Sequence, residues 1–185
     1  MAFFLVLFGG MFFWTFVEYV LHRFLGHKLL VRNKFRTEHQ KHHYKKDYFT
    51  SPMDKLLTAF IFGGATFITS YYIIGLVFAS AFSFGFISMY LLYEYTHRAC
   101  HLSAPKNKYA SLLRKHHFYH HFNDTNMNHG VTSPFWDIIF KTYIRVEKVE
   151  INNRFKMNWL CEDGTDIVKE QYRCEYVLVK KTRFT

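Results

Sequence analysis

The distribution of charge along the chain limits what it can fold into more than any other feature of the sequence. Residues 1–21 and 56–96 contain no lysine or arginine, whereas residues 22–55 and 97–185 carry all 24 basic residues. Half of the residues are hydrophobic and 21% are aromatic, yet the net charge is +10. A soluble domain of 185 residues would have difficulty burying that much aromatic surface, so charge and apolar residues have to be segregated along the chain, as they are here. We therefore expect an integral membrane protein.

The two blocks without lysine or arginine have the lengths of membrane spans. The first runs from Ala2 to Leu21, and a helix of that length extends for about 30 Å, the thickness of one hydrocarbon core. The second, from Leu56 to Thr96, is about twice as long and predicts a hairpin of two spanning helices that turns near Gly75. A signal peptide is the alternative for the first block, but it lacks a basic leading segment and a small-residue cleavage site.

The basic segments set the expected orientation in the membrane. Lysine and arginine accumulate on the cytoplasmic side of membrane spans. Three spans then place the N-terminus outside and every basic segment in the cytoplasm. We expect either a bacterial inner membrane or, in a eukaryote, the endoplasmic reticulum. Basic charge also suits nucleic-acid binding, but two apolar blocks without lysine or arginine have no role there, so we expect no nucleic-acid partner.

The predicted fold is an all-α integral membrane protein with about three transmembrane helices, a cytoplasmic histidine-rich helical cap and a small C-terminal tail with β structure. We divide it into a membrane-embedded domain, residues 1–144, and a cytoplasmic tail, residues 145–185. Trp136 to Tyr143 predicts a short amphipathic helix on the membrane surface. In the tail, Glu162-Asp163-Gly164 is a turn signal between two runs of alternating character and predicts a β-hairpin.

Histidines gather beside the predicted ends of the spans. The four clusters are His22 with His27, His39 with His42 and His43, His97 with His101, and His116 with His117, His120 and His121. Residues three and four apart share a helix face, which fits three of the clusters. The pair His22 and His27 is five apart and requires the helix to end or unwind near Gly26. The twelfth histidine, His129, stands alone, and we expect a polar surface residue.

Four clusters in such positions indicate metal binding. Neutral imidazole is a ligand for iron, zinc, copper and nickel. Imidazoles without a metal would repel one another as they protonate near their usual pKa of about 6.5. About ten ligands are too many for one ion and suit two. A chance surface cluster explains any single group, but not four at membrane boundaries. His116 is ambiguous, because it either replaces His117 as the partner of His120 or supports a ligand from outside the site.

The same segments carry a resemblance to a known family. They are Glu18 to His27 (EYVLHRFLGH), Tyr93 to His97 (YEYTH), His116 to Phe122, Gly130 to Ser133, and Trp136-Asp137. In this order they resemble the fatty acid hydroxylase superfamily of integral-membrane di-iron oxygenases, most closely its fatty acid 2-hydroxylase branch. Glu94 stands where that branch has aspartate. The resemblance covers roughly residues 12–143.

The resemblance implies a monooxygenase that hydroxylates an unactivated C–H bond of a lipid acyl chain, with two iron ions and O2 as co-substrate. Zinc is expected to replace iron readily in isolated protein. The implied metal ligands are His22, His27, His39, His42, His43, His97, His101, His117, His120 and His121. Ligand histidines usually donate their second N–H to an acceptor. For that supporting role we predict Glu18 and Glu94 first, then His116 and Asp137. Beyond the metal centre, the sequence does not identify a catalytic residue.

Two departures from the family concern partners. The chain lacks the His-Pro-Gly-Gly motif of the haem domain that is often fused to these enzymes, so we expect a separate electron donor, either a ferredoxin or a haem or flavin carrier. It also has one span fewer at the N-terminus, so we expect a partner helix or a homo-oligomer contact. The tail has no counterpart in the family.

Three other functions have to be weighed. Within the enzyme reading, the alternatives are a desaturase and a hydroxylase of a sterol, carotenoid or aminolipid. A membrane metal transporter would place its carboxylates and histidines near mid-membrane, whereas Glu18 and Glu94 lie near the cytoplasmic ends of the predicted spans. A haem electron carrier would use only two or four of the histidines.

Overall fold

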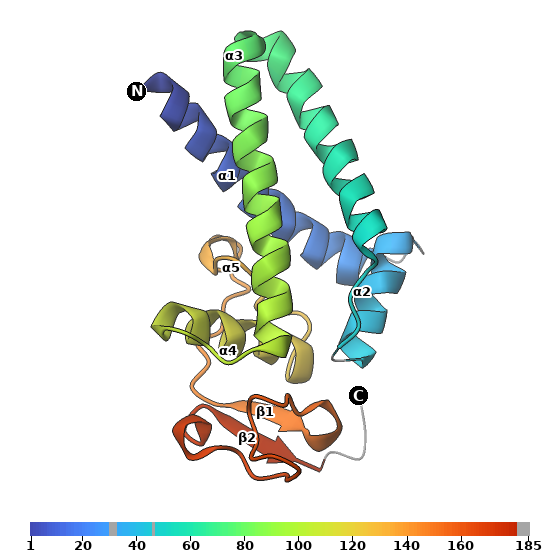
Figure 1. The fold of residues 1–185 in the computed structure, drawn as a ribbon, viewed down its shortest axis with the longest axis vertical. Coiled ribbons are helices and arrows are strands. Elements are labelled where there is room, and N and C mark those ends of the chain that lie inside the picture. The colour runs from blue at the N-terminus through green and yellow to red at the C-terminus, as the bar shows by residue number, and fades with distance from the viewer. Residues whose placement is uncertain (30–32, 46, 181–185) are drawn as a thin grey trace.

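The computed structural model describes residues 1–29, 33–45 and 47–180, and the protein is mostly helical (Figure 1). Its elements are α1 (Ala2–Val20), a π-helix η1 (Leu21–Lys28), α2 (Lys34–Tyr44), α3 (Pro52–Leu102), α4 (Lys108–Phe122), α5 (Phe135–Ile139), β1 (Val149–Asn152), the 3-10 turns η2 (Asn153–Phe155) and η3 (Glu170–Tyr172), and β2 (Tyr176–Val179). The apolar helices α1 and α3 extend toward one end of the molecule, and the two strands lie at the other, beyond α4 (Figure 1).

Within the described part of the chain, two helices are long and apolar enough to cross a membrane: Ala2–Lys28 and Pro52–Leu102. The second folds back on itself (Figure 1) at Gly75, whose φ of 74° is a backbone conformation that glycine adopts at no steric cost. The predicted hairpin turn is therefore confirmed. Side chains along α3 point outward without a protein neighbour, with Phe60 79% and Ile73 75% exposed. Apolar surface of this extent is the kind that a lipid bilayer covers.

Two glycines let α1 cross the second half of α3 with the backbones in close contact. A Cβ atom on Gly10 would lie 2.0 Å from the main-chain oxygen of Phe82, and one on Gly85 would lie 2.1 Å from that of Leu7. Below this crossing, Trp14 packs edge-on against Phe86 in a buried aromatic cluster. Small residues at a helix crossing are typical of membrane proteins, where close packing replaces the hydrophobic effect.

The short helices that carry most of the histidines are capped by asparagines. The Asn33 side chain accepts a hydrogen bond from the Arg36 amide at the start of α2, and Asn107 does the same for Ala110 at the start of α4. The buried Arg114 of α4 donates to the main-chain oxygens of Ala99, in the last turn of α3, and of Ser103, directly after the helix. Arg114 thereby fixes α4 against the end of α3.

The C-terminal segment contains β structure, but its strands do not form the predicted hairpin. β1 and β2 pair in parallel, with Val149 opposite Tyr176, so the chain between them makes a long crossover. The predicted turn at residues 162–164 closes only an isolated antiparallel bridge between Cys161 and Val168. The segment packs around Phe118 of α4 in a shared apolar core.

The predicted amphipathic helix at residues 136–143 is shorter than expected. α5 ends at Ile139, and Lys141 has a φ of 56°, which an L-residue rarely adopts and which a helix cannot contain. The chain then turns back so that the Asn128 amide donates to the Thr142 oxygen at 2.8 Å. This reversal closes the loop of residues 128–142 against α1 and α4.

We predict that alanine at the crossing glycines destabilises the protein. Gly10→Ala and Gly85→Ala each force backbone against backbone, and overpacking of this kind costs about 1–3 kcal/mol. Gly64→Ala is the matched control, because a Cβ there meets nothing within 4 Å, and alanine favours a helix over glycine. Apparent midpoints of thermal unfolding in detergent should fall for the first two variants only. A similar fall for Gly64→Ala would contradict the close crossing.

Candidate metal centre

Ten histidines from four segments converge into two groups. The first group is His22, His27, His39, His43 and His120, and the second is His42, His97, His101, His117 and His121. Within each group, one ring nitrogen from every histidine lies within 4.8 Å of all the others. The ten are the residues predicted as ligands, and the structure divides them equally between two places.

Each of the two HxxHH motifs contributes to both groups. On α2, His39 and His43 belong to the first group, while His42 belongs to the second. On α4 the assignment is reversed, with His120 in the first group. Residues four apart on a helix lie almost directly above one another, and the residue at i+3 is rotated away from them. We expected each motif to present one shared face, and this small rotation separates its members instead.

The first histidine pair is brought together by a π-helix. His22 and His27 are five residues apart, which is the hydrogen-bond spacing of a π-helix, and η1 spans Leu21–Lys28 without a break. The helix is therefore unwound from α to π geometry around Gly26 and ends at Lys28, close to the predicted place. Gly26 is buried, and a Cβ there would lie 3.0 Å from the His39 ring. The absence of a side chain lets α2 approach η1.

Main-chain oxygens orient three of the histidines. His22 Nδ1 lies 2.5 Å from the His129 oxygen, His42 Nδ1 lies 2.7 Å from the Tyr48 oxygen, and His120 Nδ1 lies 2.9 Å from the Met127 oxygen. A carbonyl only accepts, so each Nδ1 carries the proton. Nε2 of each ring is then left with its lone pair directed into the group.

The interior of each group fits a metal ion. Among the residues that the structure describes, the buried Nε2 atoms of His22, His42 and His121 have no hydrogen-bond partner. Elsewhere lone pairs face one another, as where His39 Nε2 lies 2.8 Å from His27 Nε2. An unpaired buried nitrogen is costly, and a shared cation satisfies several at once. Sites with imidazole ligands alone suit iron, zinc, copper and nickel.

Burial keeps these imidazoles in the neutral form that metals bind. The pKa of His42 falls to about 4, chiefly because burial disfavours the charged ring. Burial and then the neighbouring imidazoles hold the pKa values of His39 and His117 well below the usual 6.5. At neutral pH the lone pairs are therefore free for coordination.

The carboxylates predicted to support the histidines have other partners. Glu18 is buried, and its oxygens accept hydrogen bonds from the Val131 amide at 2.5 Å and the Thr132 hydroxyl at 2.6 Å. Glu94 forms an ion pair with Lys55. Among the described residues neither carboxylate bonds a histidine, so the partners that we predicted for them are wrong. Main-chain oxygens take that role, and Glu18 instead ties α1 to the loop of residues 128–142.

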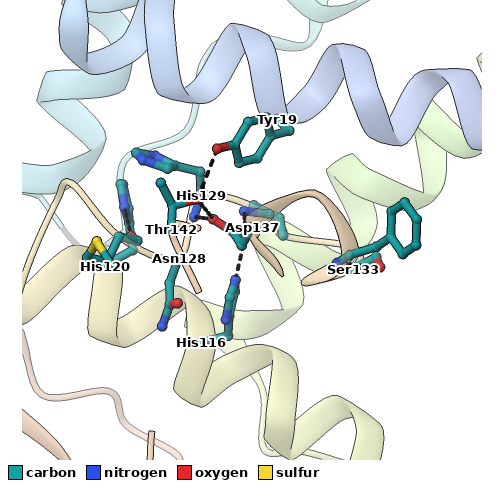
Figure 2. Close-up of polar contacts among 12 residues, drawn as sticks. Tyr19, His116, His120, Asn128, His129, Ser133, Asp137 and Thr142 are labelled. Atoms are coloured by element: carbon teal, nitrogen blue, oxygen red, sulfur yellow. Dashed lines mark hydrogen bonds and ion pairs between the residues drawn. The ribbon is translucent and has the colours of Figure 1, made fainter. Parts of the chain in front are cut away.

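Asp137 is the centre of the hydrogen-bond network in that loop (Figure 2). One of its oxygens accepts from the His129 amide at 2.8 Å and the Thr142 hydroxyl at 2.7 Å, and the other accepts from the Gly130 amide at 2.7 Å and His116 Nε2 at 3.0 Å. Although burial alone raises the pKa of Asp137, these hydrogen bonds, led by the one from His116, hold it below its usual value. The bond to Asp137 directs His116 away from both groups, and His117 takes the place in the second group for which His116 was the alternative.

His129 is buried rather than on the surface, so that prediction is wrong. Its exposed fraction is 0%. Its ring lies edge-on to that of Tyr19, and its centroid lies 5.1 Å from that of the His120 ring. Its main-chain oxygen is the acceptor for His22. Helical spacing says nothing about a residue in a loop, and the one available signal was its place directly before Gly130-Val131-Thr132-Ser133.

The chain has similarity to proteins of known type over most of its length. A sequence model of the family described as fatty acid hydroxylase matches residues 7–142. The "Fatty acid 2-hydroxylase" of Mus musculus is 33% identical over 150 residues, which cover 75% of this chain and 39% of the relative. The "Dihydroceramide fatty acyl 2-hydroxylase FAH1" of Arabidopsis thaliana is 33% identical over 141 residues, which cover 72% of this chain and 58% of the relative.

A solved structure, "Full length scs7p (only hydroxylase domain visible)", superimposes with a TM-score of 0.60 and 28% sequence identity, covering 76% of this chain and 56% of that one. The chain thus spans about two fifths to three fifths of the length of the proteins that it matches. The matched region of the family model contains all ten clustered histidines, and the segment from residue 143 onward lies beyond it.

The division into two groups predicts how metal content responds to paired substitutions. His39→Ala/His120→Ala removes two ligands from the first group, so about one ion per chain should remain in the second. His117→Ala/His120→Ala removes one ligand from each group, so both ions should bind more weakly and both should be lost on dialysis against a chelator. His116→Gln is the control and should keep the metal content of the wild type. Elemental analysis after dialysis measures all three. Equal loss in the two paired variants would contradict the grouping.

Proposed function

Since the chain belongs to the fatty acid hydroxylase family, we propose that it is a membrane-bound, metal-dependent monooxygenase that hydroxylates an unactivated C–H bond of a lipid acyl chain. The observation that carries this proposal is the pair of buried five-histidine groups inside the matched region. The names of these relatives, fatty acid 2-hydroxylase and dihydroceramide fatty acyl 2-hydroxylase, support an acyl chain as the substrate and its second carbon as the target.

We propose that each group holds one iron ion, with all ten histidines as ligands. Bound iron supplies activation of O2 with two electrons, the chemistry that an unactivated C–H bond requires. The protein contributes geometry. The main-chain oxygens of Tyr48, Met127 and His129 hold three ligand rings in place, and burial excludes water from around them. Zinc in isolated protein is compatible with this proposal, because histidine sites bind zinc well.

The proposed topology has three spans, formed by α1 and the two halves of α3, with both histidine groups on the cytoplasmic side. The basic residues of segments 22–55 and 97–185 support that orientation. The membrane is a bacterial inner membrane or the endoplasmic reticulum. We retain the division into a membrane-embedded unit, residues 1–144, and a cytoplasmic tail, residues 145–185. The predicted homo-oligomer and separate electron donor also belong to the proposal.

A cavity of about 330 Å³ between α1, α2 and the first half of α3 suits the substrate. Its wall toward the exposed side of α3 is apolar and includes Trp14, Leu57 and Ile61. At the other end it is lined by polar side chains, among them Lys34, Glu38 and Asp54, and His22 of the first group forms part of its wall. An acyl chain entering from the bilayer fits the apolar part, and a polar headgroup fits the other.

The arrangement of this cavity favours attack close to the headgroup. His22 and the polar side chains line the same cavity, and the largely exposed Lys34 forms an ion pair of 2.5 Å with Asp54. A headgroup bound to these side chains leaves only the first carbons of its acyl chain near the metal. A position deep in the chain would lie at the opposite, apolar end. The geometry therefore supports hydroxylation near the carboxyl end.

Lipid analysis of expressing cells tests the function. Acyl lipids with a hydroxyl group on the second carbon should accumulate with the wild-type chain and be absent with His39→Ala/His120→Ala. An acyl double bond would indicate a desaturase, and a hydroxylated sterol or carotenoid would indicate the corresponding hydroxylase. Lipids unchanged from those of cells without the protein, together with metal movement into vesicles, would indicate a transporter.

We further predict that a larger side chain in the apolar wall obstructs the substrate. Ile61→Trp should lower product formation by about tenfold or more, since even single-methylene misfits in apolar pockets change rates by about 10–200-fold. Metal content should not change. Phe60→Trp is the matched control, because residue 60 is adjacent but 79% exposed and faces away from the protein. Equal activity of the two variants would show that the acyl chain does not occupy this cavity.

A further inference from the structure

A second cavity, unrelated to the apolar one, lies between α4 and the chain that follows α5. It measures about 660 Å³ and is lined by Lys108, Ser111, Leu112, Lys115, His116, Tyr143, Ile144, Arg145, Val146 and Glu175. We call it the basic cleft. Its lining residues come from α4, from residues 143–146 and from Glu175. Figure 1 shows α4 and the strands away from the end toward which α1 and α3 extend. A water-soluble protein can therefore reach it while α1 and α3 are in a membrane.

The charge of the cleft is positive. Its only acidic lining residue is Glu175, which is already engaged, with its carboxylate 3.1 Å from Lys115 Nζ and 2.8 Å from the Ser111 hydroxyl. Lys108 and Arg145 are exposed, and among the described residues neither forms an ion pair. Two cations are thus left to attract an acidic surface.

The floor of the cleft is connected to the first histidine group. His116 lies there under the Tyr143 ring, with 5.7 Å between the ring centroids. His116 Nε2 bonds Asp137, which bonds the His129 amide, and the oxygen of the same residue accepts from His22 Nδ1. Figure 2 shows His116 below Asp137 and His129 above it. Hydrogen bonds, together with the backbone of His129, therefore connect the cleft to His22 of the first group.

We propose that the basic cleft is the docking surface for an acidic one-electron carrier protein, and that electrons enter through His116 and Asp137. This proposal rests on the proposed function. Each hydroxylation converts a C–H bond and one O2 into C–OH and one water, and it consumes two protons and two electrons. Two reduced carriers supply the electrons, each becoming oxidised by one. The interfaces of electron-transfer complexes are small and the complexes are short-lived, and opposite charges accelerate their association. A few cations around a cleft are therefore enough to attract the carrier.

The test uses a plant-type [2Fe–2S] ferredoxin, a small acidic carrier, and the full metal-loaded chain in detergent. Lys108→Glu/Arg145→Glu reverses the two exposed cations, and a glutamate at the first position of α4 also suits the helix dipole. Lys169→Glu/Lys180→Glu changes the net charge equally outside the cleft. The association rate of ferredoxin should fall by about tenfold or more for the first pair only, as expected for lost electrostatic steering. The difference should vanish in 1 M salt, where the screening length is about 3 Å.

Three results would overturn docking at the cleft. The two variant pairs could slow association equally, which would make the effect one of net charge. The first pair could leave association unchanged. It could also lose binding to anionic phospholipid vesicles while ferredoxin binding is retained, which would make the cleft a headgroup site. Association is measured without turnover. Failure of hydroxylation with dithionite as reductant would therefore count against the proposed function, not against docking.

Substitution of His116 tests the route. His116→Leu removes the donor to Asp137, and His116→Gln restores an N–H there. Rapid mixing of reduced ferredoxin with the oxidised protein should show slower ferredoxin oxidation in the leucine variant and recovery in the glutamine variant. Association rate and metal content should remain those of the wild type in both. Wild-type electron transfer in His116→Leu would show that electrons do not pass through this residue.

Discussion

A lone pair on a buried imidazole nitrogen has to face a proton donor or a cation, because leaving it without water or a partner costs free energy. Ten such rings lie together in this protein, and burial lowers the pKa values of those on α2 and α4, so protonation cannot satisfy most of the lone pairs. Two shared metal ions can satisfy them. The need to bring ten nitrogens to two points explains why η1, α2, α4 and the end of α3 meet at one end of the apolar helices.

The surrounding structure serves that convergence. Gly10 and Gly85 allow α1 to cross α3 closely, which sets where η1 begins. Glu18 holds the loop of residues 128–142, in which the main-chain oxygen of His129 orients His22, and the oxygen of Met127, directly before the loop, orients His120. Arg114 fixes α4 to the end of α3, and the C-terminal segment packs around Phe118 from the other side. Residues far apart in the chain therefore support the same few rings.

The apolar blocks were enough to predict the hairpin at Gly75, and the histidine clusters together with the family resemblance predicted the ten residues that converge. Both rest on local rules, the length of a span and the period of a helix. What the sequence did not reveal depends on contacts between elements. The division of each HxxHH motif follows from where the neighbouring helices lie, and the π-helix at His22 and His27 follows from packing that helical periodicity does not encode. His129 was missed because its burial depends on Asp137 and Tyr19, and the parallel pairing of β1 with β2 depends on a long crossover.

X-ray absorption at the iron edge, combined with elemental analysis of the iron-loaded protein, tests the two-ion, all-histidine centre most directly. We expect about two irons per chain, no haem absorbance, and a first shell dominated by nitrogen with the outer-shell scattering of imidazole rings. A single iron per chain, sulfur in the first shell, or a carboxylate-dominated shell would contradict the arrangement of His22 to His121 described above.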